Sequence, residues 1–136
     1  MRKFVILTDS CSDLNKQLRE EYNIDYLPMR IIYDGKDIPA SLDWEYIPAK
    51  EFYAKMRQGT RFTTSQVNSS EYKEAFEKYI AEGADVLSIS CSSALSGSYK
   101  ASTVARDEVL AAHPEAKIIC IDSLNSCMGL GIICIA

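Results

Sequence analysis

The sequence predicts an α/β fold in which a mainly parallel β-sheet is covered by helices on both faces, a three-layer α/β/α arrangement. First, short apolar runs rich in β-branched residues alternate along the chain with segments of helical periodicity. Second, parallel neighbouring strands need a crossover connection, which is usually helical, so this alternation favours a parallel sheet. Third, 136 residues, of which 47% are hydrophobic, suit one globular domain with a buried core.

In the first half of the chain, a strand is expected at residues 4–7, which form a continuous apolar run typical of a strand covered on both faces. A helix is expected over 48–58, because Pro48 suits its first turn and Gly59, just after it, tolerates the left-handed cap conformation. The predicted elements after the first strand are a helix over 15–22, a strand or extended segment over 24–33, a turn at Asp34-Gly35 and a helix over 48–58.

In the second half, residues 61–67 are expected to be a polar connector. Asn68 and Glu71 have the spacing of a capping box and predict a helix that runs to Glu82 and is closed by Gly83. The elements predicted after it are a strand over 85–90, a helix over 98–112, a strand over 117–122 and a helix from Met128 onward.

The charge and cysteine content narrow the classes of partner and location. The formal net charge is −4, the isoelectric point is near 5.0 and the 15 Lys and Arg residues are scattered, so nucleic acid is not an expected partner. The apolar run near the amino terminus is too short for a signal peptide or a membrane span, so we expect a cytoplasmic protein without stable membrane insertion. The five cysteines include no CxxC pair, and no disulfide framework is expected.

The last residues form an apolar run, 130–135, with no polar capping residues after it. A helix that ended there would leave carbonyl groups unpartnered and apolar side chains exposed unless another domain or subunit covered them. We therefore expect further chain downstream, or a dimer through this surface. The alternative is a helix that frays at its end.

Three segments rich in hydroxyl groups, 8–13, 90–98 and 122–129, follow predicted strands and precede predicted helical segments. The carboxyl ends of parallel strands share one edge of the sheet, where ligands bind, and helix amino termini favour anions. The sequence thus predicts one anion site built from several loops. The alternative is that the Ser and Asp residues only cap helices and form turns.

The motifs of nucleotide phosphate sites, GxxxxGK[ST] and GxGxxG, are absent, and the second of these segments has no lysine before Lys100. A carboxylate needs only a few neutral donors, and an adjacent apolar tunnel would hold a hydrocarbon tail. Taken singly, each candidate for that tunnel fits an ordinary core position better, so periodicity does not establish the tunnel. The candidates are Ile31, Phe52, Phe62, Leu95 and Met128.

Four motifs resemble those of the DegV family, in family order and over essentially the whole chain. Residues 8–14 (TDSCSDL) resemble the opening TDS-x-SDL, and residues 64–66 resemble the TSQ motif. Residues 92–99 (SSALSGSY) resemble SS-x-LSGTY, and residues 122–131 are similar to the family's D-S/T-x-x-x-S-x-G-x-G segment. Cys11, Val67 and Ser98 depart from the usual residues, but the changes are small and we expect the site to tolerate them.

The resemblance implies a DegV amino-terminal-domain-like fold and a non-catalytic, cytoplasmic protein that binds a long-chain fatty acid without a cofactor. It implies that the acid's carboxylate meets Thr64 and Ser96 and that the bound acid is presented to a fatty-acid kinase for phosphorylation. Residues 1–136 would be one lipid-binding domain, without the second domain that closes over the ligand in the family. The other expected ligand-binding residues are Gly97, Ser10, Ser65, Ser93 and Ser126.

Two other classes of site are compatible with the residues. A hydrolase with a Ser or Cys nucleophile would need a base, and the only histidine, His113, is expected at the opposite edge of the sheet. Asp9 and Asp122 remain as bases, although an Asp at the end of a strand more often anchors loop amides. A metal site would use the soft ligands Cys11, Cys91 and Cys127, but no pair has the close spacing of structural zinc motifs.

Overall fold

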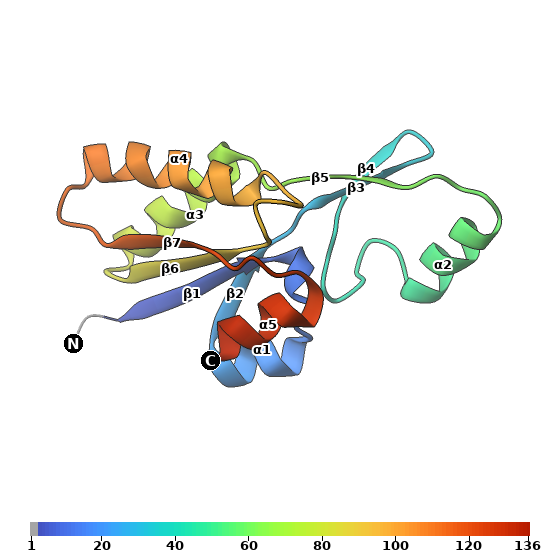
Figure 1. Ribbon diagram of the computed structural model, residues 1–136, viewed down its shortest axis with the longest axis horizontal. Helices are drawn as coiled ribbons and strands as arrows, with labels where there is room; N and C mark the ends of the chain where they lie inside the picture. The colour runs from blue at the N-terminus through green and yellow to red at the C-terminus, as the bar shows by residue number, and fades with distance from the viewer. Residues whose placement is uncertain (1–2) are drawn as a thin grey trace.

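The main sheet has four parallel strands in the order β2-β1-β6-β7, as the computed structural model, which describes residues 3–136, shows (Figure 1). The apolar run at the amino terminus forms a central strand of this sheet, and that strand continues two residues beyond the predicted end. The strands are β1 (Phe4–Asp9), β2 (Ile24–Leu27), β6 (Asp85–Ser90) and β7 (Ile118–Asp122).

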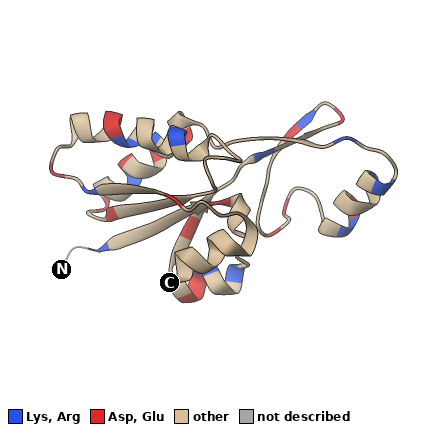
Figure 2. Cartoon of the chain, in the orientation of Figure 1, with Lys and Arg blue, Asp and Glu red and all other residues tan. Residues whose placement is uncertain are grey.

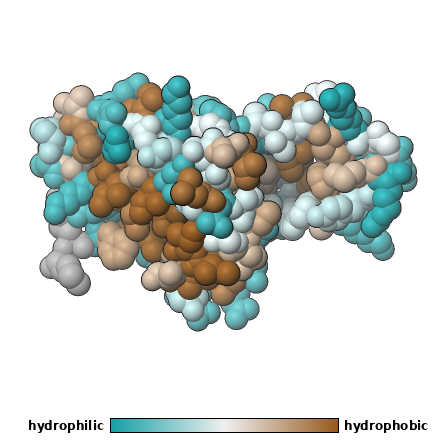
Figure 3. All heavy atoms as spheres, in the orientation of Figure 1, coloured by the Kyte–Doolittle hydropathy of each residue, from teal (hydrophilic) through white to brown (hydrophobic). Residues whose placement is uncertain are grey.

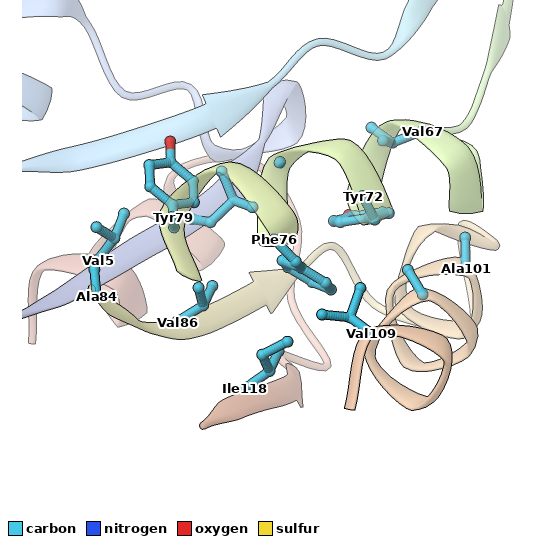
Figure 4. Packing of buried hydrophobic residues seen from close by; sticks show 13 residues of the cluster. Val5, Val67, Tyr72, Phe76, Tyr79, Ala84, Val86, Ala101, Val109 and Ile118 are labelled. Carbon is cyan, nitrogen blue, oxygen red and sulfur yellow. The ribbon is translucent and has the colours of Figure 1, made fainter. Parts of the chain in front are cut away.

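Helices cover both faces of this sheet, so the predicted three-layer α/β/α architecture is confirmed (Figure 1). Helices α3 (Ser69–Ala81) and α4 (Ser98–Ala112) lie on one face, and α1 (Lys16–Tyr22) and α5 (Cys127–Ile135) lie on the other. The side chains of a strand alternate between the two faces. Val5 and Leu7 therefore pack under α3 and α4 (Figure 4), while Ile6 packs on the α1 and α5 side.

A second, smaller sheet is antiparallel and has the strand order β4-β3-β5. Its strands are β3 (Arg30–Tyr33), β4 (Lys36–Pro39) and β5 (Thr63–Ser65), and α2 (Ala49–Arg57) lies beyond it (Figure 1). The expectation of one extended segment over 24–33 is wrong, because the chain leaves the main sheet after Leu27 and begins β3 at Arg30. Pro28 lies at the break, where a residue without an N–H cannot extend the strand ladder. The expectation that residues 61–67 form only a connector is also wrong, because Thr63–Ser65 form β5.

Local signals at the turns and helix ends were predicted correctly. Asp34 and Gly35 both have positive φ and form the tight turn of the β3–β4 hairpin, as a two-residue hairpin loop requires. Asn68 accepts a hydrogen bond from the Glu71 N–H at 3.0 Å, and the Glu71 carboxylate accepts one from the Asn68 N–H at 2.9 Å. These two bonds complete the capping box at the start of α3.

One part of the main sheet is left uncovered on the α1 and α5 side. Helix α5 shields Ile89 of β6, but on β7 the side chains of Ile119 and Ile121 remain 59% and 38% exposed. Ile132 of α5 is 61% exposed nearby, and Figure 3 shows one continuous apolar surface over β7 and α5. We call the surface of Ile119, Ile121 and Ile132 the apolar strip. No helix among residues 3–136 combines the length and the hydropathy needed to cross a bilayer.

Candidate functional site

A pocket of about 370 Å³ lies where the two sheets meet, at the edge formed by the carboxyl ends of β1 and β6. Its walls come from the loops after these strands, from the segment around β5 and from the start of α5. None of its lining side chains carries a formal charge at neutral pH. The lining residues are Cys11, Met29, Thr64, Gln66, Cys91, Leu95, Ser96, Gly97 and Ser126.

Thr64 and Ser96, the two residues expected to meet a ligand carboxylate, line this pocket together. Thr64 is the middle residue of β5 and lies directly opposite Ile31 of β3. The side chains of Thr64 and Ile31 therefore project from the same face of the small sheet. Ser96 comes from the loop between β6 and α4. Within residues 3–136, no hydrogen bond occupies the Thr64 hydroxyl group, which leaves it available to a ligand.

The loop before α4 folds back on itself through Ser92. The Ser92 carbonyl accepts hydrogen bonds from the N–H groups of Leu95 (2.9 Å) and Ser96 (3.0 Å). The Ser98 N–H donates to Ser96 Oγ at 3.2 Å. In the described part of the chain, the N–H of Gly97 has no acceptor, and Gly97 both lines the pocket and caps the 15-residue helix α4. The pocket therefore offers a free amide donor at the positive end of a helix dipole.

Gln66 covers Gly97 and was not expected from the sequence as part of the site. A Cβ atom added to Gly97 would collide with the carboxamide group at the end of the Gln66 side chain, so a larger residue there requires Gln66 to move. Gln66 and Gly97 also line a neighbouring pocket that includes Lys100. Gln66 lies two residues after Thr64, and the period of two along an extended segment could have indicated that both face the same side.

Asp9 and Asp122 hold the loops rather than project into the pocket. The Asp9 carboxylate is fully buried and accepts hydrogen bonds from the N–H groups of Cys11 and Cys91, both at 2.9 Å. Burial raises the pKa of this carboxyl group. The Asp122 carboxylate accepts from the N–H groups of Ser93 and Leu124, both at 3.1 Å, and its pKa is lowered mainly by hydrogen bonding to Ser93. Both residues anchor loop amides, as predicted.

Of the other expected ligand residues, Ser126 lines the pocket, whereas Ser10, Ser65 and Ser93 do not. The Ser10 hydroxyl accepts from the Met29 N–H at 2.8 Å and donates to the Ala40 carbonyl at 2.7 Å, which ties the end of β1 to the small sheet. Ser65 follows Thr64 in β5 and therefore faces the opposite side. Ligand contacts by these three serines stay predictions.

The residues expected to line an apolar tunnel do not all lie together. Leu95 lines the pocket, while Ile31 lines a second pocket of about 290 Å³ with Trp44, Tyr46 and Tyr53. Phe52 and Phe62 pack against each other, with ring centroids 4.4 Å apart. Met128, on α5, lines neither of these two pockets.

Among residues 3–136, no His, Asp, Glu or Lys side chain lines the pocket beside its cysteines and serines. Burial raises the pKa of the Cys11 and Cys91 thiols, and Cys11 Sγ lies 3.4 Å from the Met29 sulfur. Because the thiolate is the nucleophilic form, neither cysteine is activated. His113 follows α4 and precedes β7, at the other edge of the sheet, where its Nδ1 lies 3.7 Å from Glu115. Within residues 3–136, no group of three or more His, Cys, Asp or Glu residues is arranged to hold a metal ion.

Comparison with known families adds to this geometry. The model of the DegV family, described as a family of uncharacterised proteins, matches residues 3–136, nearly the whole chain. The chain belongs to the DegV family. A DegV domain-containing protein of Clostridium perfringens is 42% identical over 133 residues, which are 98% of this chain and 45% of the relative. The chain thus spans less than half the length of this DegV relative.

Solved structures of a stearic-acid-binding protein and of DegV proteins share the fold. A stearic-acid-binding protein from Eubacterium ventriosum matches with a TM-score of 0.86 and 26% identity, over 96% of this chain and 44% of its own. A DegV family protein from Thermus thermophilus, described by its fatty acid binding, matches with a TM-score of 0.83 and 27% identity, over 98% and 45%. A DegV lipid-binding protein from Thermotoga maritima matches with a TM-score of 0.82 and 30% identity, over 96% and 45%.

Proposed function

We propose that this chain binds a long-chain fatty acid and holds its carboxylate in the pocket of Thr64 and Ser96. The observation that carries the proposal is the convergence of two hydroxyl groups and the free Gly97 N–H on one uncharged pocket. Hydrogen bonds from neutral donors to a carboxylate are charge-assisted and about twice as strong as neutral ones. The DegV structures described as binding fatty acids support the same ligand class.

The uncharged lining favours a monoanion over a phosphate group. A phosphate carries about two negative charges near neutral pH and is usually held by Arg, Lys or a metal ion. None of these lines the pocket, whereas the amino terminus of α4 supplies only a partial positive charge. A volume of about 370 Å³ lies at the lower end of small-molecule sites, which suits a headgroup site that opens toward a separate tail site.

The proposal extends to the protein's partners and location. Residues 1–136 act as the amino-terminal lipid-binding domain of a longer cytoplasmic protein, and a second domain closes over the ligand. The domain is not itself catalytic and presents the bound acid to a fatty-acid kinase subunit. The apolar strip is the surface through which the chain pairs with another domain or with a second copy of itself. Its three exposed isoleucines support this assignment.

Substitution of the two hydroxyl residues tests the carboxylate site. We expect Thr64→Ala and Ser96→Ala each to weaken fatty-acid binding by about 1 kcal/mol or more, because each removes one hydrogen bond to a charged group. Isothermal titration calorimetry measures the effect, and native mass spectrometry of the untreated protein should reveal a co-purified fatty acid. Thr63→Ala is the matched control, because Thr63 neighbours Thr64 but faces the other side of β5. Unchanged affinity in both Thr64→Ala and Ser96→Ala would contradict the proposal.

A further inference from the structure

Residues 44–62, which we call the α2 lobe, extend beyond the small sheet and away from the main sheet (Figure 1). No residue of α2 is buried, whereas each of the other four α-helices contains at least one buried residue. Most of the stability of a helix in a protein comes from packing of its apolar face. Helix α2 therefore lacks the packing surface that the other helices have.

Helix α2 has an apolar side and a polar side. Four residues with the i, i+3, i+4, i+7 spacing of one helix face form the apolar side. They are Ala49, Phe52, Tyr53 and Met56. Tyr53 and Met56 remain 48% and 46% exposed. Glu51, the only acidic residue of this helix, lies on the opposite side by the same periodicity.

Aromatic rings extend the apolar side beyond the helix. The centroid of the Phe52 ring lies 4.4 Å from that of Phe62 and 5.6 Å from that of Trp44. Trp44 and Tyr46 are 38% and 56% exposed. The lobe therefore exposes Trp, Tyr and Met side chains around a partly buried pair of Phe rings. Trp and Tyr are enriched where proteins meet the headgroups of a bilayer, because each ring has an apolar body and a polar tip.

The α2 lobe has the opposite net charge to the rest of the chain. Its four cations and two acidic residues give a net charge of +2, and because the whole chain carries −4, the remainder carries −6. Figure 2 shows Lys and Arg positions along α2 and the segment after it. On the helix, the cations flank the apolar side, so their long side chains can reach past it. The four cations are Lys50, Lys55, Arg57 and Arg61.

We propose that the α2 lobe docks reversibly on the surface of a bilayer that contains anionic lipids. The helix lies in the plane of the interface, with Trp44, Tyr53 and Met56 among the headgroups and the cations beside the lipid phosphates. A second copy of the chain fits this surface less well, because two positively charged lobes repel each other. With nine residues, α2 is too short to span the hydrocarbon layer, so the contact is peripheral.

The inference goes beyond the proposed function, and no residue of the α2 lobe lines the pocket of Thr64 and Ser96. Trp44 is the only tryptophan of the chain, so its fluorescence reports on the lobe. We expect its emission to shift to shorter wavelength on titration with phosphatidylcholine vesicles that contain about a quarter phosphatidylglycerol. Vesicles of phosphatidylcholine alone should bind about tenfold more weakly or less, and added salt should weaken binding to the anionic vesicles, because it screens the charges.

Substitution of the cations tests the charge contribution. The double variant Lys50→Gln with Arg57→Gln should weaken binding to the anionic vesicles about 25-fold, since each cation near an anionic surface contributes about fivefold. The matched control is Lys16→Gln with Lys73→Gln, which removes the same charge from exposed positions on α1 and α3. This control should bind within about twofold of the unsubstituted chain, because charges far from the surface are screened.

Substitution of Met56 tests the apolar contribution. Met56→Gln keeps a good helix-forming residue and should weaken vesicle binding about fivefold, because a half-exposed apolar side chain no longer enters the headgroup region. Far-ultraviolet circular dichroism without vesicles checks that each variant keeps its helices.

Three results would overturn the docking surface. Equal losses in the Lys50 and Arg57 pair and in the control pair would show only a long-range effect of net charge. Equal binding to neutral and anionic vesicles, or no binding to either, would show that the cations do not recognise anionic lipid. A sedimentation coefficient that falls in Met56→Gln without vesicles would assign the lobe to a contact between copies. Each result leaves the carboxylate site standing, because fatty-acid titrations test that site separately.

Discussion

Gly97 combines three properties at one position: it lines the pocket, its N–H has no acceptor in the described chain, and its Cα lies against the Gln66 carboxamide. Its φ of −80° lies in a region open to any residue. A side chain at position 97 is thus limited by space alone, and that space is occupied by the flexible end of the Gln66 side chain.

This contact leads to a prediction at the scale of single residues. Gly97→Ala should displace the Gln66 side chain and weaken fatty-acid binding by roughly 1 kcal/mol or more, the lower range for an added methyl group in a packed site. The double variant Gly97→Ala with Gln66→Ala removes the collision and should recover most of the affinity. Titration calorimetry on the two single variants and the double variant checks this coupling, which equal losses in Gly97→Ala and the double variant would disprove.

At the scale of elements, the small sheet determines where one wall of the pocket lies. Strand β5 has only three residues, all polar and exposed, and no apolar alternation identifies it. It exists because Thr63–Ser65 pairs with β3, which is a contact between distant parts of the chain. The sequence could therefore indicate Thr64 through its motif and the side on which Gln66 lies through the period of two, but it could not place the small sheet that carries Thr64.

Helix α3 begins with the capping box of Asn68 and Glu71. Asn68→Ala should lower the free energy of unfolding by about 1 kcal/mol, because the Glu71 N–H loses its acceptor. Glu71→Ala should cost less once Asn68 has been replaced, since the two residues form one motif. Urea denaturation of the two single variants and the double variant measures the coupling, and strict additivity would contradict it.

At the scale of the whole molecule, the layers and the shared edge for the loops were predictable, because they follow from alternating strands and helices in a parallel sheet. Asp9 and Asp122 as loop anchors followed from the same topology. The wall formed by Met29 was not predictable, since it depends on how the small sheet packs against the large one, whereas Cys91 lies in the expected loop segment 90–98. Charged residues of both signs are distributed over the helices, strands and turns (Figure 2), in keeping with the scattered pattern of Lys and Arg in the sequence.

The apolar strip leads to a prediction about association. Ile119→Lys and Ile132→Lys should reduce self-association, because each places a charge on the exposed apolar surface. Thermal stability should change little, as both side chains are about 60% exposed. Analytical ultracentrifugation over a range of concentrations checks the result. Val104→Lys on α4 is the control, being also exposed but on the other side of the sheet, and an unchanged sedimentation coefficient in all three variants would rule out the strip as an interface.

The Ser10 hydroxyl group accepts from the Met29 N–H, just before β3, and donates to the Ala40 carbonyl, just after β4. A single oxygen atom therefore ties both ends of the β3–β4 hairpin to the end of β1. Thr64 is carried by the small sheet and Ser96 by a loop of the large one, so the gap between their hydroxyl groups depends on the angle at which the sheets are joined. Through this tie, Ser10 contributes to the distance between Thr64 and Ser96 although its own side chain does not line their pocket.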